Sequence, residues 1–153
     1  MKKFIFAFIL FALLLTVNAA PFQLNKRATT FGSCPYPYVD SLNVTMVTDP
    51  PKSEKSDSFN VSGNLTQVDI TKNQTLLEIF YCNPDGSQIG DYYSQVFNES
   101  IKAGTQFTVT ASDVPTPKLP DSYLILVIIG DKDNDPSNPY HVVLYACVVA
   151  DVV

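Results

Sequence analysis

The sequence lacks most of the side chains on which enzymes depend. Among 153 residues the only histidine is His141, and no nucleophile elbow, phosphate-binding glycine loop or zinc-ligand spacing is present. His141 follows Tyr140 inside a strand pattern, where a structural histidine is favoured over a catalytic base. We therefore expect a protein without enzymatic activity and without a cofactor.

A metal site is also not expected. Asp131, Asp133 and Asp135 imitate the start of a calcium-binding loop, because hard cations prefer clustered oxygen ligands. The sixth position of that loop is Pro136 instead of glycine, however, and the twelfth is Val142 instead of glutamate. The pattern favours a solvated hairpin loop.

Positive charge is scarce. The chain has 10 basic and 15 acidic residues, for a net charge of −5. Four of the basic residues lie in an N-terminal part that we expect to be removed, which would leave 6 lysines against 15 acids and a net charge of −9. Nucleic-acid binding is not expected, because its affinity comes mainly from phosphate neutralisation. A polybasic patch for anionic membranes is missing as well.

The N-terminal part has the pattern of a secretory signal peptide. Two lysines precede an apolar core from Phe4 to Leu15, and small residues suited to signal peptidase end at Ala19. Residues 20–27 form a short pro-segment that ends in the dibasic pair Lys26-Arg27. We expect residues 1–19 to be the signal peptide, residues 28–153 to be one mature domain, and the protein to be secreted or delivered to a vacuolar lumen by the same route.

Glycosylation motifs agree with secretion. Five sites fit the N-x-[ST] pattern, and we expect glycans on some of them. Their acceptor residues are Asn43, Asn60, Asn64, Asn73 and Asn98.

The cysteine count is odd. In an oxidising compartment Cys34, Cys82 and Cys147 should give one pair and one leftover thiol, and the residues alone leave three pairings open. Neither a cation nor a histidine lies near Cys82 in sequence to lower its pKa, so a buried or capped thiol is expected there.

Short strands separated by turns account for the mature chain. Apolar residues recur with period two, helical periodicity is missing, and the connections are rich in Pro, Gly, Asn and Asp. The pattern predicts an all-β, immunoglobulin-like antiparallel two-sheet β-sandwich of about seven strands. The predicted strands are 41–48, 58–66, 75–82, 92–97, 106–111, 122–130 and 141–149.

One of these strands does not alternate. Residues 123–129 are seven apolar residues in a row, too few for a membrane-spanning helix, which needs about 20, and typical of a strand buried on both sides. Tyr123, Ile125, Val127 and Ile129 should lie on one face, with Leu124, Leu126 and Ile128 on the other. We expect this second face to be covered by a loop, a glycan or another molecule.

Several short motifs resemble the ML lipid-recognition domain family in order and spacing. DPP at Asp49–Pro51 and FNVSGNLT at Phe59–Thr66 are similar to the family's opening "NPP … G … L.I.A.GTL". SIKAG at Ser100–Gly104 resembles "CPIKKG", LPDSY at Leu119–Tyr123 resembles "IPPGKY", and CVVADV at Cys147–Val152 resembles "CLEATV". The family includes fungal phosphatidylglycerol/phosphatidylinositol transfer proteins and the Niemann-Pick type C sterol carrier.

The sequence also departs from that family. The two cysteines of the family's second disulfide are both missing, at 89–91 and at 99–101, and Asp121 replaces the glycine of "PPGKY". The turn before Tyr123 is therefore expected to differ, and Cys82 has no family counterpart.

The resemblance implies a sandwich whose sheets are splayed around a lipid tail, with the first and last matched cysteines, Cys34 and Cys147, joined. It implies a sterol or phospholipid ligand, transient membrane contact and a monomer. The side chains expected to line the cavity, chosen by strand alternation and by the matched segments, are Val61, Leu77, Ile79, Tyr81, Tyr93, Phe97, Phe107, Val109, Tyr123, Ile125, Val127 and Leu144. The alternative function is that of a secreted glycoprotein with a filled core that binds a protein or glycan partner.

Overall fold

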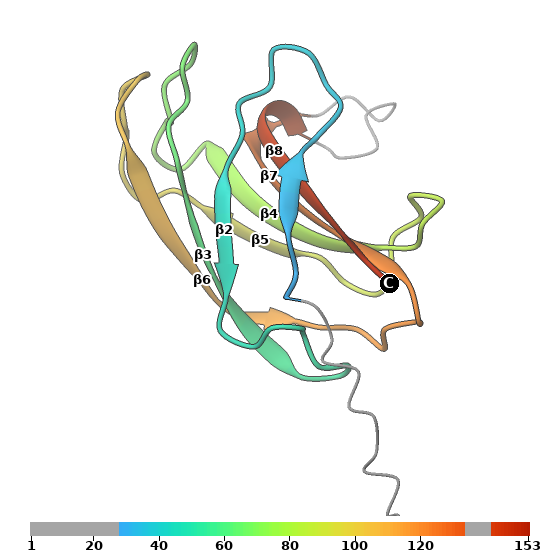
Figure 1. Ribbon diagram of the computed structural model, residues 1–153. Coiled ribbons are helices and arrows are strands. Elements are labelled where there is room, and N and C mark those ends of the chain that lie inside the picture. The colour runs from blue at the N-terminus through green and yellow to red at the C-terminus, as the bar shows by residue number, and fades with distance from the viewer. Residues whose placement is uncertain (1–27, 134–141) are drawn as a thin grey trace, which may run out of the picture.

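The computed structural model describes residues 28–133 and 142–153, which form a two-sheet antiparallel β-sandwich, as predicted (Figure 1). No helix in these residues is long and apolar enough to cross a membrane. The strands are β1 (Phe31–Ser33), β2 (Asn43–Met46), β3 (Ser56–Gly63), β4 (Thr75–Cys82), β5 (Tyr93–Val96), β6 (Phe107–Pro115), β7 (Tyr123–Lys132) and β8 (Val142–Val152).

The sheets differ in size. The large sheet has the order β1-β8-β7-β4-β5 and the small sheet has the order β2-β3-β6. β7 is the central strand of the large sheet, paired with β8 on one side and β4 on the other. The small sheet covers one of its faces, and a second apolar cluster forms on the other, which accounts for its continuous apolar run.

The two faces of β7 divide as the sequence predicts. Tyr123, Ile125, Val127 and Ile129 belong to the cluster of side chains packed between the sheets, and each exposes 2% or less of its surface. Residues 124, 126 and 128 point the other way and join a separate apolar cluster on the outside of the large sheet. The outer cluster is completed by Phe80, Cys82, Val142 and Cys147, with Cys34, Val39, Leu76 and Leu144 packed against it.

A register shift in β8 overturns one prediction. Ile129 pairs with Ala146, but the next residue, Gly130, pairs with Leu144, so one residue of β8 is extra at this point. A Cβ on Gly130 would lie 2.3 Å from the carbonyl oxygen of Val143, so the close approach of β8 requires glycine here. The bulge puts Leu144 on the outer face, and its prediction as a lining residue of the inter-sheet space is wrong.

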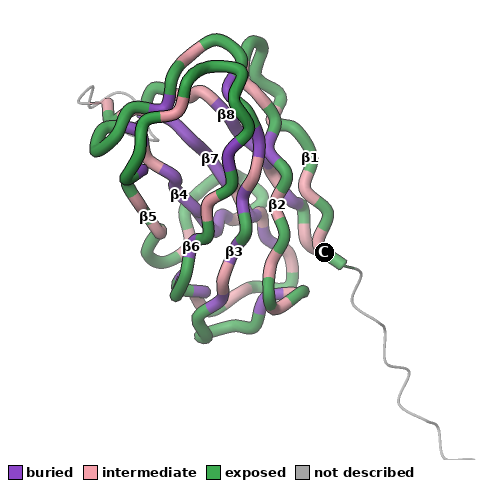
Figure 2. The backbone as a smooth tube through the Cα atoms, turned by 90° about the vertical axis from the view of Figure 1, so that its left-hand side faces the viewer, coloured by how far each residue is buried: buried purple, intermediate pink, exposed green. Residues whose placement is uncertain are grey.

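The small sheet alternates regularly. Phe59 and Val61 of β3 are fully buried against the large sheet, whereas Asn60 between them is exposed. Figure 2 shows this alternation of buried and less buried residues along β3. Where β3 pairs regularly with β2 and β6, the outward positions are uncharged and polar, namely Asn43, Thr45, Asn60, Ser62, Thr108 and Thr110.

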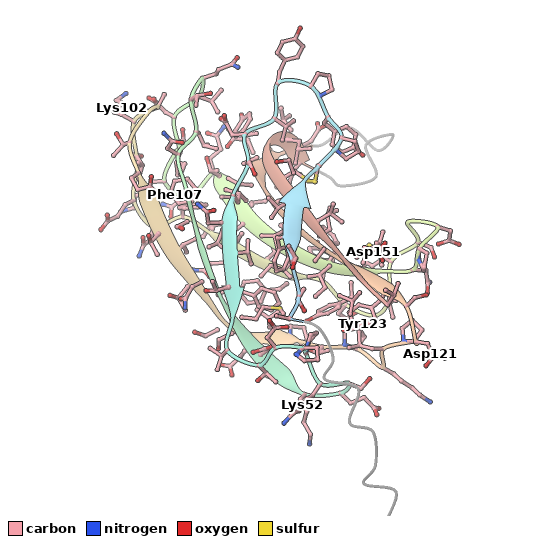
Figure 3. All side chains as sticks on the ribbon, viewed as in Figure 1. Lys52, Lys102, Phe107, Asp121, Tyr123 and Asp151 are labelled. Carbon is pink, nitrogen blue, oxygen red and sulfur yellow. A yellow bond between two sulfur atoms is a disulfide. The ribbon has the colours of Figure 1, made fainter. Side chains whose placement is uncertain are left out.

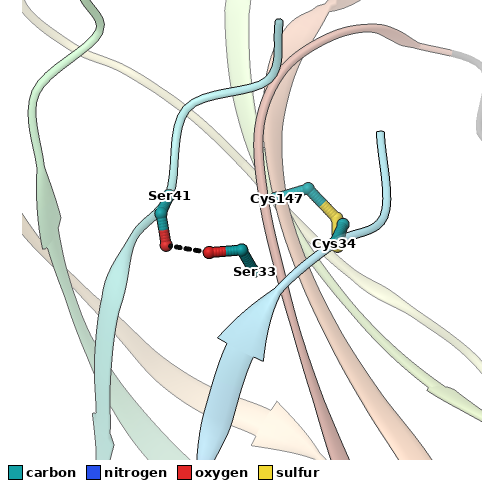
Figure 4. The surroundings of a disulfide bond; sticks show 4 residues. All are labelled: Ser33, Cys34, Ser41 and Cys147. Atoms are coloured by element: carbon teal, nitrogen blue, oxygen red, sulfur yellow. Dashed lines mark hydrogen bonds between the residues drawn. A yellow bond between two sulfur atoms is a disulfide. The ribbon is translucent and has the colours of Figure 1, made fainter. Parts of the chain in front are cut away.

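A disulfide closes the fold. Cys34 and Cys147 are bonded, with their Cα atoms 5.5 Å apart, which confirms the pairing that the family resemblance implies (Figure 4). Beside it, Ser33 Oγ donates a hydrogen bond to Ser41 Oγ at 3.0 Å. Residues 34–40 form a loop with both ends on β8, because the Cys34 N–H donates to the Cys147 carbonyl, and the Asp40 backbone exchanges hydrogen bonds with the Tyr145 carbonyl and the Cys147 N–H. Val39 of this segment packs on the outer cluster, so a loop covers part of that face.

Candidate functional site

A hollow of about 920 Å³ opens at one end of the sandwich, within the size range of small-molecule sites. Two loops far apart in sequence line it, at 47–53 and 119–121, together with the first residue of β7. In Figure 3, Lys52, Asp121 and Tyr123 lie at this end, whereas Lys102 and Phe107 lie at the other. The complete lining is Val47, Thr48, Asp49, Pro50, Pro51, Lys52, Ser53, Leu119, Pro120, Asp121 and Tyr123.

Backbone and side-chain hydrogen bonds tie the two loops together. The Leu119 N–H donates to Ser53 Oγ at 2.7 Å, the Glu54 N–H donates to the Pro117 carbonyl at 3.2 Å, and the Thr116 N–H donates to the Lys55 carbonyl at 2.9 Å. The DPP and LPDSY segments that carry the family resemblance therefore meet at one hollow.

Tyr123 connects the hollow to the interior. It is only 2% exposed, it lines the hollow, and its hydroxyl has no hydrogen-bond partner among the described residues. Burial raises the pKa of this phenol, and the nearby carboxylate of Asp49 raises it further. The hydroxyl therefore stays protonated at neutral pH and remains available to a polar atom of a ligand.

More polar groups lie behind Tyr123. The Tyr81 hydroxyl is 3.2 Å from Thr116 Oγ1, and burial raises the pKa of Tyr81 to about 12. Asp57 is 5% exposed, and its Oδ1 accepts hydrogen bonds from the N–H groups of Thr48 and Ser58, while its Oδ2 has no partner among the described residues. This end of the inter-sheet space is polar.

The rest of the inter-sheet space is apolar. Phe97 and Phe107 meet edge to face near the other end of the sandwich, with ring centroids 5.9 Å apart. Of the predicted lining residues, nine are buried between the sheets: Val61, Leu77, Ile79, Tyr81, Phe97, Phe107, Tyr123, Ile125 and Val127. Tyr93 and Val109 are partly buried against the same cluster, and Leu144 lies outside it. That these side chains contact a lipid stays a prediction.

Sequence reasoning missed the rim of the hollow. Asp49, Lys52 and Leu119 lie in proline-rich stretches that read only as turns between strands. The signal was the family resemblance itself, because DPP lies outside the predicted strands and LPDSY enters one only with its last two residues. The buried Asp57 had no signal, since a single aspartate at the start of a strand is common.

Other reactive groups are engaged or buried. Cys82 is a free thiol, 8% exposed, and burial raises its pKa, as expected for an unreactive cysteine. Asp131 accepts hydrogen bonds from Gln74 Nε2 and Thr75 Oγ1. Within 28–133 and 142–153, no group of three His, Cys, Asp or Glu side chains is placed to hold a metal ion.

The five predicted glycosylation acceptors are all exposed. Asn43 and Asn60 lie on the outer face of the small sheet, and Asn60 Oδ1 accepts a hydrogen bond from Thr110 Oγ1 at 2.8 Å. Asn64, Asn73 and Asn98 lie in loops. The predicted signal peptide, the pro-segment, His141 and Asp135 lie outside the described residues.

Comparison with protein-family models and with curated proteins gave no match for this chain. The likeness to the ML lipid-recognition domain therefore stays a prediction, supported by the order of its short motifs.

Proposed function

We propose that the protein is a secreted lipid-binding protein of the ML type, which holds the tail of a sterol or phospholipid between its two sheets and transfers it between membranes. The observation that carries this proposal is Tyr123: its ring lines the hollow, its hydroxyl is buried without a partner among the described residues, and Ile125, Val127 and Ile129 follow it inward on the same strand face. An amphiphile matches this order of groups, with its polar atom at Tyr123 and its tail beyond.

Desolvation supplies the affinity. Each methylene that leaves water for an apolar lining gains about 0.8 kcal/mol, so ten methylenes give about 8 kcal/mol before the costs of association. The tail also has to displace the packed side chains between the sheets. β5 and β6 are unpaired edges of their sheets, so no backbone ladder joins the sheets on that side and they can move apart there. This function needs no catalytic group, and we propose that the protein acts as a monomer that contacts membranes transiently.

A second candidate is a secreted glycoprotein that binds a protein or glycan partner. The tight interior favours it, because Val61, Ile125 and Val127 are fully buried and leave no exposed apolar surface between the sheets. A filled core would hold no lipid.

Organic extraction of the purified secreted protein, followed by mass spectrometry, separates the two candidates. The lipid-binding proposal predicts a sterol or phospholipid in near-stoichiometric amount. An extract without lipid, together with no uptake of added lipid, would favour the interaction glycoprotein.

A further inference from the structure

A second hollow, of about 660 Å³, lies on the outer face of the large sheet over β4 and β5; we call it the β4–β5 groove. Apolar side chains lie toward its two ends, with Leu76 and Val96 at one end and Tyr92 at the other, where Tyr92 stacks on Phe80 with ring centroids 5.1 Å apart. Tyr92 exposes 45% and Val96 exposes 48% of their surfaces. Between these ends the buried Glu78 lies opposite Ser94, whose Oγ donates a hydrogen bond to Glu78 Oε1 at 3.0 Å. The groove is lined by Asn73, Gln74, Leu76, Glu78, Tyr92, Ser94, Val96 and Lys132.

Asn73 is both a wall of this groove and a predicted glycosylation acceptor, in the motif Asn73-Gln74-Thr75. It is exposed in the turn before β4, at a φ of 61°, a left-handed conformation that asparagine tolerates better than most residues. Its N–H donates to the Phe97 carbonyl at 2.9 Å, which fixes the turn beside the Val96 end of β5. A group attached to its side chain would therefore start at one end of the groove.

We propose that an N-linked glycan on Asn73 lies along the β4–β5 groove and covers Leu76, Val96 and Tyr92. The strand extends about 14 Å from Val96 to Tyr92, at about 3.4 Å per residue. The groove is therefore elongated, and the first two sugars of the glycan, its chitobiose core, can lie along it. The C–H faces of the sugar rings pack on Leu76, Val96 and the ring of Tyr92, and their hydroxyls meet the Ser94–Glu78 pair between these residues. Lys132, which also lines the groove, offers a further donor. This inference goes beyond lipid binding and rests only on the secretory route.

The covalent step needs a lipid-diphosphate-linked oligosaccharide of the secretory route. The side-chain amide nitrogen of Asn73 bonds to the anomeric carbon of the sugar, the bond from that carbon to the phosphate oxygen breaks, the amide loses a proton and the lipid diphosphate leaves. In the folded protein Thr75 is fully buried, and its hydroxyl accepts from the Thr71 N–H and donates to Asp131 Oδ1. The transfer must therefore precede the folding of β4.

The other exposed sequons offer a contrast. Asn43 and Asn60 lie on the polar outer face of the small sheet, where a glycan covers no apolar surface. Asn98 follows β5 but does not line the groove, so it is the matched control.

The test uses the full chain secreted from a eukaryotic host, compared with Asn73→Asp and Asn98→Asp. Both variants remove one sequon with the same change of charge, and aspartate tolerates the left-handed turn at position 73. Glycopeptide mass spectrometry reports occupancy, and hydroxyl-radical footprinting reports access to the side chains. We expect Asn73 to be glycosylated, and oxidation of Tyr92 and Val96 to rise several-fold in Asn73→Asp but not in Asn98→Asp.

Glycan release provides the second readout. An amidase acting on the native protein should release the Asn73 glycan several-fold more slowly than the Asn98 glycan, and Tyr92→Ala should remove the difference. An unmodified Asn73 in the secreted parent, or equal oxidation of Tyr92 in parent and Asn73→Asp, would overturn the proposal. Protection of Tyr92 that persists in Asn73→Asp and grows with protein concentration would also overturn it and assign the groove to a second copy of the chain.

Discussion

The two sheets share one interior but have opposite outer faces. In its regularly paired part, the outer face of the small sheet presents Asn43, Thr45, Asn60, Ser62, Thr108 and Thr110, all uncharged and polar, and Asp113 is exposed farther along β6. The outer face of the large sheet presents the apolar outer cluster around Phe80 and Ile128, with a disulfide beside it. A sheet with one solvated face needs only alternation, whereas a sheet with two apolar faces needs a second cover.

The cover of the large sheet explains two features that packing between the sheets does not explain. The segment 34–40, held by Cys34 at one end and by the Asp40 backbone at the other, brings Val39 onto the outer cluster. Cys82 is buried in that cluster without a disulfide partner. On this account the Cys34–Cys147 disulfide secures the cover of the large sheet as well as the chain ends.

The largest expected effect comes from removing this disulfide. The bond spans 113 residues, and a loop of that size is worth about 4–5 kcal/mol in the loop-entropy model. Cys34→Ala combined with Cys147→Ala should lower the free energy of unfolding in urea by about that amount, while Ser41→Ala, outside the bond, should change it little. A loss below about 1 kcal/mol would mean that the cover does not depend on the bond.

The second-largest expected effect is the difference in unfolding free energy between variants of the two outer faces. Ile128 is 1% exposed in the outer cluster, so Ile128→Ala should cost about 2–5 kcal/mol of unfolding free energy. Thr108→Ala, at an exposed position on the small sheet, should stay within about 0.5 kcal/mol. Equal costs for the two variants in chemical denaturation would show that the outer cluster is not a second core.

A kinetic measurement sharpens the same comparison. Burial raises the pKa of the Cys82 thiol, and the covered face limits the access of reagents. Alkylation by iodoacetamide should be at least about tenfold slower in the native protein than in urea, and should accelerate only as the pH rises above the usual thiol range. Native labelling as fast as unfolded labelling would show that the cover opens freely.

The smallest expected effect is that of membrane charge on lipid uptake. Neither the regularly paired outer face of the small sheet nor the outer cluster of the large sheet includes a lysine. With an expected net charge of −9 after processing, long-range attraction to anionic vesicles should be weak. Lipid uptake should change less than about twofold between neutral and anionic donor vesicles. A steep salt dependence of uptake from anionic vesicles would instead reveal a local basic site, with Lys52 at the hollow as its first candidate.

The strands of the sandwich could be predicted because alternation and apolar runs record burial directly. Residues 75–82 form β4 with the predicted bounds, and the split of β7 into two faces is confirmed. β1 was missed because its three residues are too few to show a period. Leu144 was misplaced because a bulge shifts the alternation by one residue. The tight contact at Gly130 that accompanies the bulge leaves no mark in the sequence pattern around Leu144.

The hollow was harder to predict than the strands. It forms where two loops meet, and their pairing depends on hydrogen bonds such as that from the Leu119 N–H to Ser53 Oγ, which join residues 66 positions apart. The cover of the large sheet depends in the same way on a loop that has no periodicity of its own. Alternation assigns residues to faces, but it does not say which loop lies over a face.

Lipid uptake by variants of the two faces of β7 tests the central claim most directly. Ile125 and Val127 point between the sheets, whereas Leu126 points to the outer cluster, so a phenylalanine at each position fills a different space. The parent should take up a fluorescent sterol or phospholipid, and so should Leu126→Phe. Ile125→Phe and Val127→Phe should lose that uptake. Their thermal midpoints should be no lower than that of Leu126→Phe. The account is contradicted if the parent takes up no lipid and both inward variants lose about 1–3 kcal/mol of unfolding free energy, as is typical of an overpacked core. The space between the sheets would then be filled.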